Sequence, residues 1–286
     1  MGRGRRRAAA LGIGLALLVV GDQLALRTVL ADGEVAGLRV APYPSARFFA
    51  GQDQALAELR EKLARGTPTW MPFDRELGWA PRPDTVFDLY AYDSRGARVG
   101  NPESGRPGGA ATLRVAAYGC SFTHGDEVDG PATWAAALER QADVRIENFG
   151  VGGYGLDQAL LRMRRTLAPE ATDEVWFGLL PGAALRVTTC YRPLVSPWSN
   201  ALAFKPRFEP VGLDGLELVP DPVASAEEIV LLMERPELFL ERMLPVDPWV
   251  ARRPAAFRPL GTSPWHHSAL GRLVLTWSVR RAPDPS

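Results

Sequence analysis

The stretch LRVAAYGCSFTHG, residues 113–125, decides how the rest of the chain is interpreted. Its first seven residues are β-formers that end at Gly119, which predicts a strand over 113–119 followed by a polar loop. Two more strands are predicted at 144–150 and 174–181, and helices are predicted between the strands at 131–142 and 156–168. This alternation predicts an α/β fold, a parallel sheet with helices packed on it.

The third predicted strand, EVWFGLLP, is nearly all apolar, which favours a position at the centre of the sheet with both faces covered. In parallel sheets of this kind, binding sites form at the carboxyl ends of the strands. The three strand ends carry Gly119-Cys120-Ser121, Asn148-Phe149-Gly150 and Leu180-Pro181-Gly182. We therefore expect a functional site where these three tripeptides meet.

Ser121 stands at a strand end, where the backbone holds a side chain rigidly. A serine hydroxyl is a good nucleophile only when a base takes its proton and hydrogen-bond donors are positioned to bind the oxyanion. The backbone N–H of Ser121 is one donor, and Gly150, Gly152 and Gly153 let a second N–H approach closely because they lack a side chain. The alternatives are that Ser121 is only a turn or capping residue and that the glycines form a plain tight turn. Cys120 is a weaker nucleophile candidate, because its side chain is expected to point into the protein.

These strand-end residues resemble the SGNH (GDSL-like) hydrolase family. The run Gly119–Thr123 resembles the family's first block, Gly-Asp-Ser, with Cys120 in place of the aspartate. The run Asn148–Arg162 resembles the second block, and Cys190–Pro210 resembles an insertion found in a membrane-anchored subgroup. The resemblance extends over roughly residues 70–281.

The resemblance implies a three-layer flavodoxin-like sheet with helices on both faces. It also implies an extracytoplasmic serine hydrolase that acts on ester bonds, an esterase or deacylase of acyl groups on glycans or lipids. An acyltransferase that uses the same site is an alternative. No cofactor is expected, and no CxxC or HExxH spacing occurs in the chain, so no metal site is expected.

The sequence departs from the family pattern in its last two blocks. Ala183 stands where the family has an asparagine whose amide completes the oxyanion hole, and losing one such donor typically costs about 10²–10³ in rate. The final Asp-x-x-His block is absent, so the base is unknown and His124, His266 and His267 are weak candidates for it. We interpret His266 and His267 as surface or capping residues near a helix start, and His124 as a loop residue.

Only three strands are predicted, whereas the family's core has about five. The chain is therefore expected to be either a fragment whose base lies on a missing segment or a degenerate member of the family. A degenerate member would be catalytically inactive and would bind an envelope glycan or a partner protein.

The N-terminus has four arginines among its first seven residues, followed by an apolar stretch from Ala8 to Val20 that weakens towards Leu30. A signal anchor would use about the 20 residues that cross a bilayer, whereas a cleaved signal peptide would use the shorter apolar centre. Arg27 would disturb a cleavage region and Asp22 lies towards the outer end, so we favour the anchor. In both cases the N-terminus stays in the cytoplasm and the domain lies outside it.

The 286 residues carry a formal net charge of 0, which offers no basic surface for nucleic acid. Cys120 and Cys190 are the only cysteines, and we expect two buried thiols rather than a disulfide.

Composition divides the chain into three parts. Residues 1–31 are the basic start and the membrane or signal segment, and residues 32–111 are a linker with a helix and a small hairpin. Residues 112–286 are the SGNH-like domain, with an insertion at about 187–225. The shorter elements predicted are a helix over 50–65, a hairpin turn at 93–96, a loop over 101–111, two short helices broken at Pro236 and a last helix over 263–281. The aromatic part of the insertion is expected to be a structural flap, with shaping of the pocket as the alternative.

Overall fold

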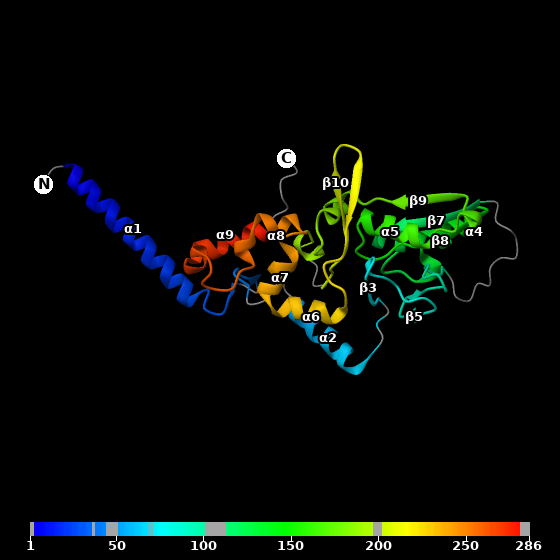
Figure 1. The fold of residues 1–286 in the computed structure, drawn as a ribbon, viewed down its shortest axis with the longest axis horizontal. Coiled ribbons are helices and arrows are strands. Elements are labelled where there is room, and N and C mark those ends of the chain that lie inside the picture. The colour runs from blue at the N-terminus through cyan, green and yellow to red at the C-terminus, as the bar shows by residue number, and fades with distance from the viewer. Residues whose placement is uncertain are drawn as a thin grey trace. The chain divides into compact units, whose positions relative to one another are not determined.

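The computed structural model describes residues 3–35, 38–43, 51–67, 69, 71–100, 113–196 and 202–280 (Figure 1). The predicted loop over 101–111 lies outside this part. The chain divides into two compact units. The helical unit comprises Met1–Glu58, Pro193–Leu202 and Ile229–Ser286, and the sheet unit comprises Leu59–Arg192 and Ala203–Glu228.

A three-stranded parallel sheet is the centre of the sheet unit. Its strands are β7 (Leu113–Gly119), β8 (Val144–Asn148) and β9 (Glu174–Gly178), in the order β8-β7-β9. The helices α4 (Trp134–Gln141) and α5 (Leu156–Thr166) connect them. The predicted α/β class, the three strands and the two connecting helices are therefore confirmed.

Alternate residues of β7 point to opposite faces of the sheet, as the pleat requires. Val115 and Ala117 pack in one cluster with Ala135 of α4, whereas Ala116 and Tyr118 pack in another with Ala159 of α5. The two helices therefore cover opposite faces, and the unit has three layers.

The position predicted for the third strand was wrong. The central strand is β7, and β9 forms hydrogen bonds only with β7 among the described strands, so it lies at an edge of the sheet. Its residues are exposed or half-buried, and Leu179 just after it is 66% exposed. The apolar run therefore does not reflect burial on both faces.

Short antiparallel pairs complete the strands of the sheet unit. They are β3 (Phe73–Asp74) with β4 (Gly78–Trp79), β5 (Val86–Phe87) with β6 (Tyr90–Ala91), and β10 (Arg207–Val211) with β11 (Gly215–Val219). The predicted turn at 93–96 is confirmed, because Gly96 N–H donates to the Asp93 carbonyl and Tyr92 pairs with Arg98. The β10–β11 hairpin, drawn in yellow in Figure 1, was not predicted.

The helical unit contains α1 (Arg3–Thr28), the pair β1 (Glu34–Val35) and β2 (Leu38–Arg39), α7 (Pro236–Met243), α8 (Pro248–Arg252) and α9 (Ala269–Arg280). Two further helices, α2 (Gln52–Arg65) and α6 (Ala226–Glu234), begin in one unit and end in the other. The predicted break at Pro236 is confirmed, since α6 ends at Glu234 and Pro236 begins α7. The last helix is shorter than predicted, because 264–267 form a 3₁₀ turn before α9.

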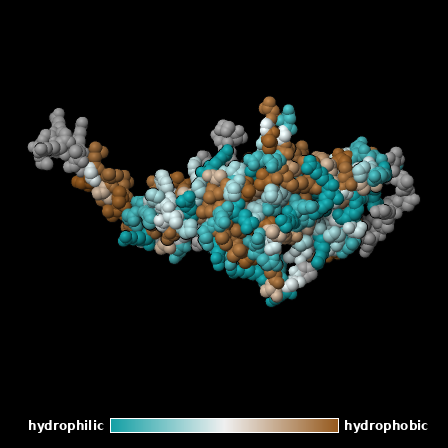
Figure 2. Space-filling view, viewed as in Figure 1, coloured by the Kyte–Doolittle hydropathy of each residue, from teal (hydrophilic) through white to brown (hydrophobic). Residues whose placement is uncertain are grey.

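Residues Ala10–Thr28 of α1 form a 19-residue stretch that is long and apolar enough to cross a membrane. None of it is buried, and Figure 2 shows hydrophobic side chains along the described part of this helix. This agrees with the predicted N-terminal membrane segment as far as length and composition can.

Candidate functional site

Ser121 is the first residue of α3 (Ser121–His124), a single helical turn that follows β7 directly. Cys120 is the N-cap, and Gly125 ends the turn in the left-handed conformation with φ of 80°. The amides of a first helical turn have no acceptor within the helix. In the part of the chain that the structure describes, the Ser121 hydroxyl has no hydrogen-bond partner, and its half-buried side chain stands at the carboxyl edge of the sheet. This is the position predicted for a nucleophile, and no general base is bonded to it.

The turn after β8 brings the predicted glycines alongside α3. Val151 N–H donates to the carbonyl of Gly119 over 3.1 Å, so the turn continues along the end of β7. Gly150 N–H donates to Asn148 Oδ1 over 3.0 Å, so this amide is already occupied. A side chain at Gly150 would collide with the backbone of Thr123 and His124. Gly150 is therefore needed for close packing.

Gly152 and Gly153 differ from Gly150, because their N–H groups meet no acceptor among the described residues. The carbonyl of Gly152 accepts from Trp79 Nε1 over 3.1 Å, which fixes the orientation of the turn. Gly153 adopts a φ of 82° that few other residues tolerate. These two amides and the first-turn amide of Ser121 all lie near the strand end, and none of the three has an acceptor among the described residues.

His124 is not the loop residue that we predicted. It lies in α3, only 1% exposed, with Nδ1 2.5 Å from Asp126 Oδ1 and Nε2 2.8 Å from the Tyr92 hydroxyl. Burial lowers the pKa of His124, although the hydrogen bond to Asp126 raises it in part, so the ring is neutral at pH 7. The network assigns Nδ1–H as the donor to Asp126 and Nε2 as the acceptor from Tyr92. Both ring nitrogens are therefore engaged with groups other than Ser121.

His266 and His267 belong to the helical unit. His266 is 1% exposed and its Nε2 lies 2.8 Å from the carbonyl of Ala255, so the expectation of a surface position was wrong for this residue. His267 is exposed, and its carbonyl accepts from Gln23 Nε2 over 2.6 Å. Both lie just before α9, whose first turn is capped by the Ser268 hydroxyl.

Arg192 is a charged residue at the site that sequence reasoning missed. A Cβ on Gly153 would stand 3.0 Å from the Arg192 guanidinium carbon, so this cation lies against the glycine turn. Burial lowers the pKa of Arg192 to about 10, with the Arg186 cation adding to the effect, and the group stays charged at pH 7. The signal in the sequence was an arginine inside an otherwise apolar run, Cys190–Leu194.

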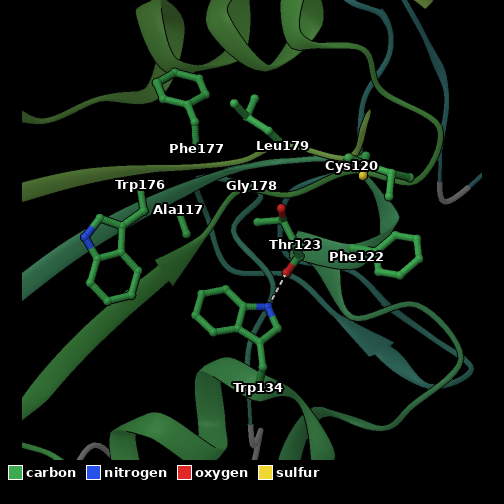
Figure 3. Close-up of a pocket in the computed structure, with 10 residues that line it drawn as sticks. Ala117, Cys120, Phe122, Thr123, Trp134, Trp176, Phe177, Gly178 and Leu179 are labelled. Atoms are coloured by element: carbon green, nitrogen blue, oxygen red, sulfur yellow. Dashed lines mark hydrogen bonds between the residues drawn. The ribbon is translucent and has the colours of Figure 1, made fainter. Parts of the chain in front are cut away.

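An open, mainly apolar pocket of about 380 Å³ lies beside the site (Figure 3). Cys120 and Phe122, which flank Ser121, form part of its wall. Trp134 and Trp176 stack with ring centroids 6.5 Å apart, and Trp134 Nε1 donates to the Thr123 carbonyl over 2.7 Å. Figure 3 shows both indoles on one side of β9, with Phe177 on the other. The pocket can receive a small apolar or aromatic group.

Three further sequence predictions concern this region. Ala183 lies in a 3₁₀ helix, Pro181–Thr188, where it is buried and offers no side-chain donor. Cys120 and Cys190 are buried thiols rather than a disulfide, as predicted. Within the described ranges, no group of three or more His, Cys, Asp or Glu side chains is arranged to hold a metal ion.

No protein-family model matches this chain, and no curated protein matches it. A proposal for the function therefore rests on the geometry of the site.

Proposed function

We propose that this chain is an SGNH-type serine hydrolase that cleaves ester bonds outside the cytoplasm and is anchored to the membrane through α1. The observation that carries the proposal is Ser121, placed at the carboxyl end of β7 beside a glycine turn with free amide hydrogens. The flavodoxin-like arrangement and the cytoplasmic N-terminus belong to the same proposal.

In the reaction, Ser121 Oγ attacks the ester carbonyl carbon and the serine proton passes to a base. The oxyanion accepts hydrogen bonds from the amides of Ser121 and of Gly152 or Gly153, and the Arg192 cation adds positive charge beside them. The ester C–O bond then breaks, the alcohol leaves with the proton, and water hydrolyses the acyl-serine. This charge stabilisation stands in for the amide that Ala183 cannot supply.

His124 is the only histidine of the sheet unit and is already neutral and oriented by Asp126. To act as the base, its Nε2 has to exchange the Tyr92 hydroxyl for the Ser121 hydroxyl. This exchange costs a buried hydrogen bond, so we expect slow turnover.

The pocket favours a substrate with an apolar acyl group. Its walls include Phe122, Trp134 and Trp176, which offer large apolar surfaces to an acyl chain. Among the acylated glycans and lipids that an envelope enzyme meets, those with short to medium acyl chains fit such a pocket best.

The test uses the full chain in detergent with nitrophenyl acetate, butyrate and octanoate. We expect kcat/KM to rise from acetate to butyrate or octanoate, and Ser121→Ala to abolish turnover. Trp176→Ala is the matched pocket variant and should reduce the preference for the longer chains while leaving acetate hydrolysis near the wild-type rate. Equal loss for all three esters in Trp176→Ala would contradict an acyl pocket.

A second candidate is a non-catalytic SGNH-like domain that binds an envelope glycan or a partner protein. The engaged Nε2 of His124 and the absence of a donor at Ala183 favour it. Ester turnover that disappears in Ser121→Ala would exclude this candidate. A folded wild-type chain with no turnover on any of the three esters would favour it over the hydrolase.

A further inference from the structure

The last helix, α9, has its apolar and polar faces reversed relative to a helix of a water-soluble protein. Its exposed face is formed by Leu270, Leu273, Val274 and Trp277, with exposed fractions of 67%, 45%, 45% and 56%. Its buried face includes Arg272 and Thr276. In water, burial of the apolar residues would favour the opposite orientation.

The buried polar residues fix this orientation. Arg272 Nε donates to the carbonyl of Ala41 over 2.9 Å, and the N–H of Ala41 donates to Thr276 Oγ1 over 2.7 Å. Beside them, Leu30 and Val40 pack against Ala269. Rotating α9 to bury its apolar face would leave these polar groups without their partners, so the apolar stripe is held outward.

The start of α9 is tied to the membrane helix α1. Asp22 Oδ1 accepts from the N–H of Leu270 over 2.8 Å and from the hydroxyl of Ser268 over 3.1 Å, which caps the first turn of α9. Gln23 Nε2 donates to the carbonyl of His267. In Figure 1 α9 begins beside the C-terminal end of α1 and does not run back along its apolar part.

The length of α1 sets the depth of this junction. Only the 14 residues 8–21 lie between the last N-terminal arginine and Asp22, and at 1.5 Å per residue they span about 21 Å. The hydrocarbon core is about 30 Å thick, so the membrane-spanning stretch has to continue past Asp22 towards Thr28. Asp22 then lies about 9 Å inside the outer end of the span, and its hydrogen bonds hold the first turn of α9 in the outer part of the same bilayer.

We propose that α9 lies in the outer lipid interface of the membrane that α1 crosses, with its apolar stripe among the acyl chains near the headgroups. At 12 residues, or about 18 Å, α9 is too short to cross the bilayer. Trp277 and the neighbouring Trp265, which is 56% exposed, are the residues that favour this depth. The inference rests on membrane anchoring through α1 and is independent of the hydrolase chemistry.

The test places an environment-sensitive fluorophore at one introduced cysteine of the full chain in phosphatidylcholine–phosphatidylglycerol nanodiscs. Cys120 and Cys190 are buried, so the unsubstituted chain measures background labelling. Leu273→Cys reports on the α9 stripe, Leu15→Cys reports on the exposed middle of α1, and Glu241→Cys on α7 is the exposed control of the same unit. Lipids that carry a doxyl quencher near the headgroup or deep in the acyl chain are compared for each variant.

We expect the shallow quencher to reduce fluorescence at position 273 at least twofold more than at position 241. The deep quencher should act most strongly at position 15. Quenching at position 15 without quenching at position 273 would overturn the proposal for α9 while leaving the anchor in place. Absence of quenching at both positions would overturn the anchor and the proposal together, and neither result bears on ester hydrolysis by Ser121.

Discussion

The Tyr92 hydroxyl lies 2.8 Å from Nε2 of His124, the ring nitrogen that a catalytic histidine turns towards its nucleophile. Asp126 holds the other nitrogen at 2.5 Å. The two contacts have the geometry of the Asp–His half of a Ser-His-Asp triad, with a tyrosine in the place of the serine. In this structure Ser121 therefore has no base bonded to it. Mutation of Tyr92 tests what its hydroxyl contributes at His124.

Removing the Tyr92 hydroxyl should destabilise the sheet unit. In Tyr92→Phe a buried imidazole nitrogen loses its partner, which typically costs about 1–3 kcal/mol. The free energy of unfolding in urea measures this loss. Tyr90→Phe is the matched control, because the Tyr90 hydroxyl accepts from the exposed amide of Glu127, which water can replace. An equal loss in both variants would contradict the importance of the buried bond. If His124 can serve as the base, Tyr92→Phe should also speed ester turnover.

The protonation of His124 should link stability to pH. Burial places the folded pKa of His124 below the unfolded value of about 6.5. Between the folded and the unfolded pKa, the unfolded chain binds a proton at His124 that the folded chain does not. The contribution of His124 to the free energy of unfolding is therefore complete above pH 6.5 and is lost as the pH falls from 6.5 to the folded pKa. An NMR titration of the imidazole resonances, assigned with His124→Gln, measures it directly. A His124 midpoint above 6.5 would contradict the burial argument.

Asp221 should have the opposite effect to His124 on how stability depends on pH. Burial raises the pKa of its carboxyl to about 7, and its buried Oδ2 has no hydrogen-bond partner among the described residues. The folded protein therefore holds the proton more tightly, and stability falls as the pH rises from about 4 to about 7. Asp221→Asn should raise the free energy of unfolding at pH 8 by up to about 4 kcal/mol, and by little at pH 4. Asp214→Asn, at an exposed site, makes the same charge change and is the matched control.

The elements with strong local signals were predictable from sequence. The strand Leu113–Gly119 was predicted with its correct bounds, because its β-formers end at a glycine, whereas the polar loop predicted after it is the helical turn α3. The edge position of β9 was not predictable, because strand order depends on long-range pairing, which the apolar content of a single strand does not reveal. The β10–β11 hairpin was missed because Pro210 interrupts the strand pattern.

The candidate site was predictable only in part. Ser121 and the glycines lie where the strand ends placed them, but Tyr92 is 32 residues before His124 in the sequence and carries no motif. The spacing of Arg192 from Gly153 likewise gives no local signal that the two meet. Contacts of this kind form through tertiary folding and cannot be predicted from the local sequence.

Gly150 should prove essential for packing rather than for its amide. A methyl group at this position meets the backbone of α3, which cannot move as a flexible side chain can, so Gly150→Ala should cost roughly 1–3 kcal/mol. Gly182→Ala is the matched control, since its added carbon meets nothing within 4 Å. Urea denaturation compares the two. A Gly150→Ala protein as stable as Gly182→Ala would contradict the close approach of the glycine turn to α3.

The most direct test of the central claim is covalent labelling of Ser121 by a fluorophosphonate probe, located by peptide mass spectrometry in the folded full chain. We predict a single modified serine, Ser121, with no label on Ser94, which is exposed in a turn. Ser121→Ala should remove the label without changing the unfolding temperature. A folded wild-type chain that leaves Ser121 unmodified, or that labels Ser94 equally, would contradict a serine nucleophile at the end of β7.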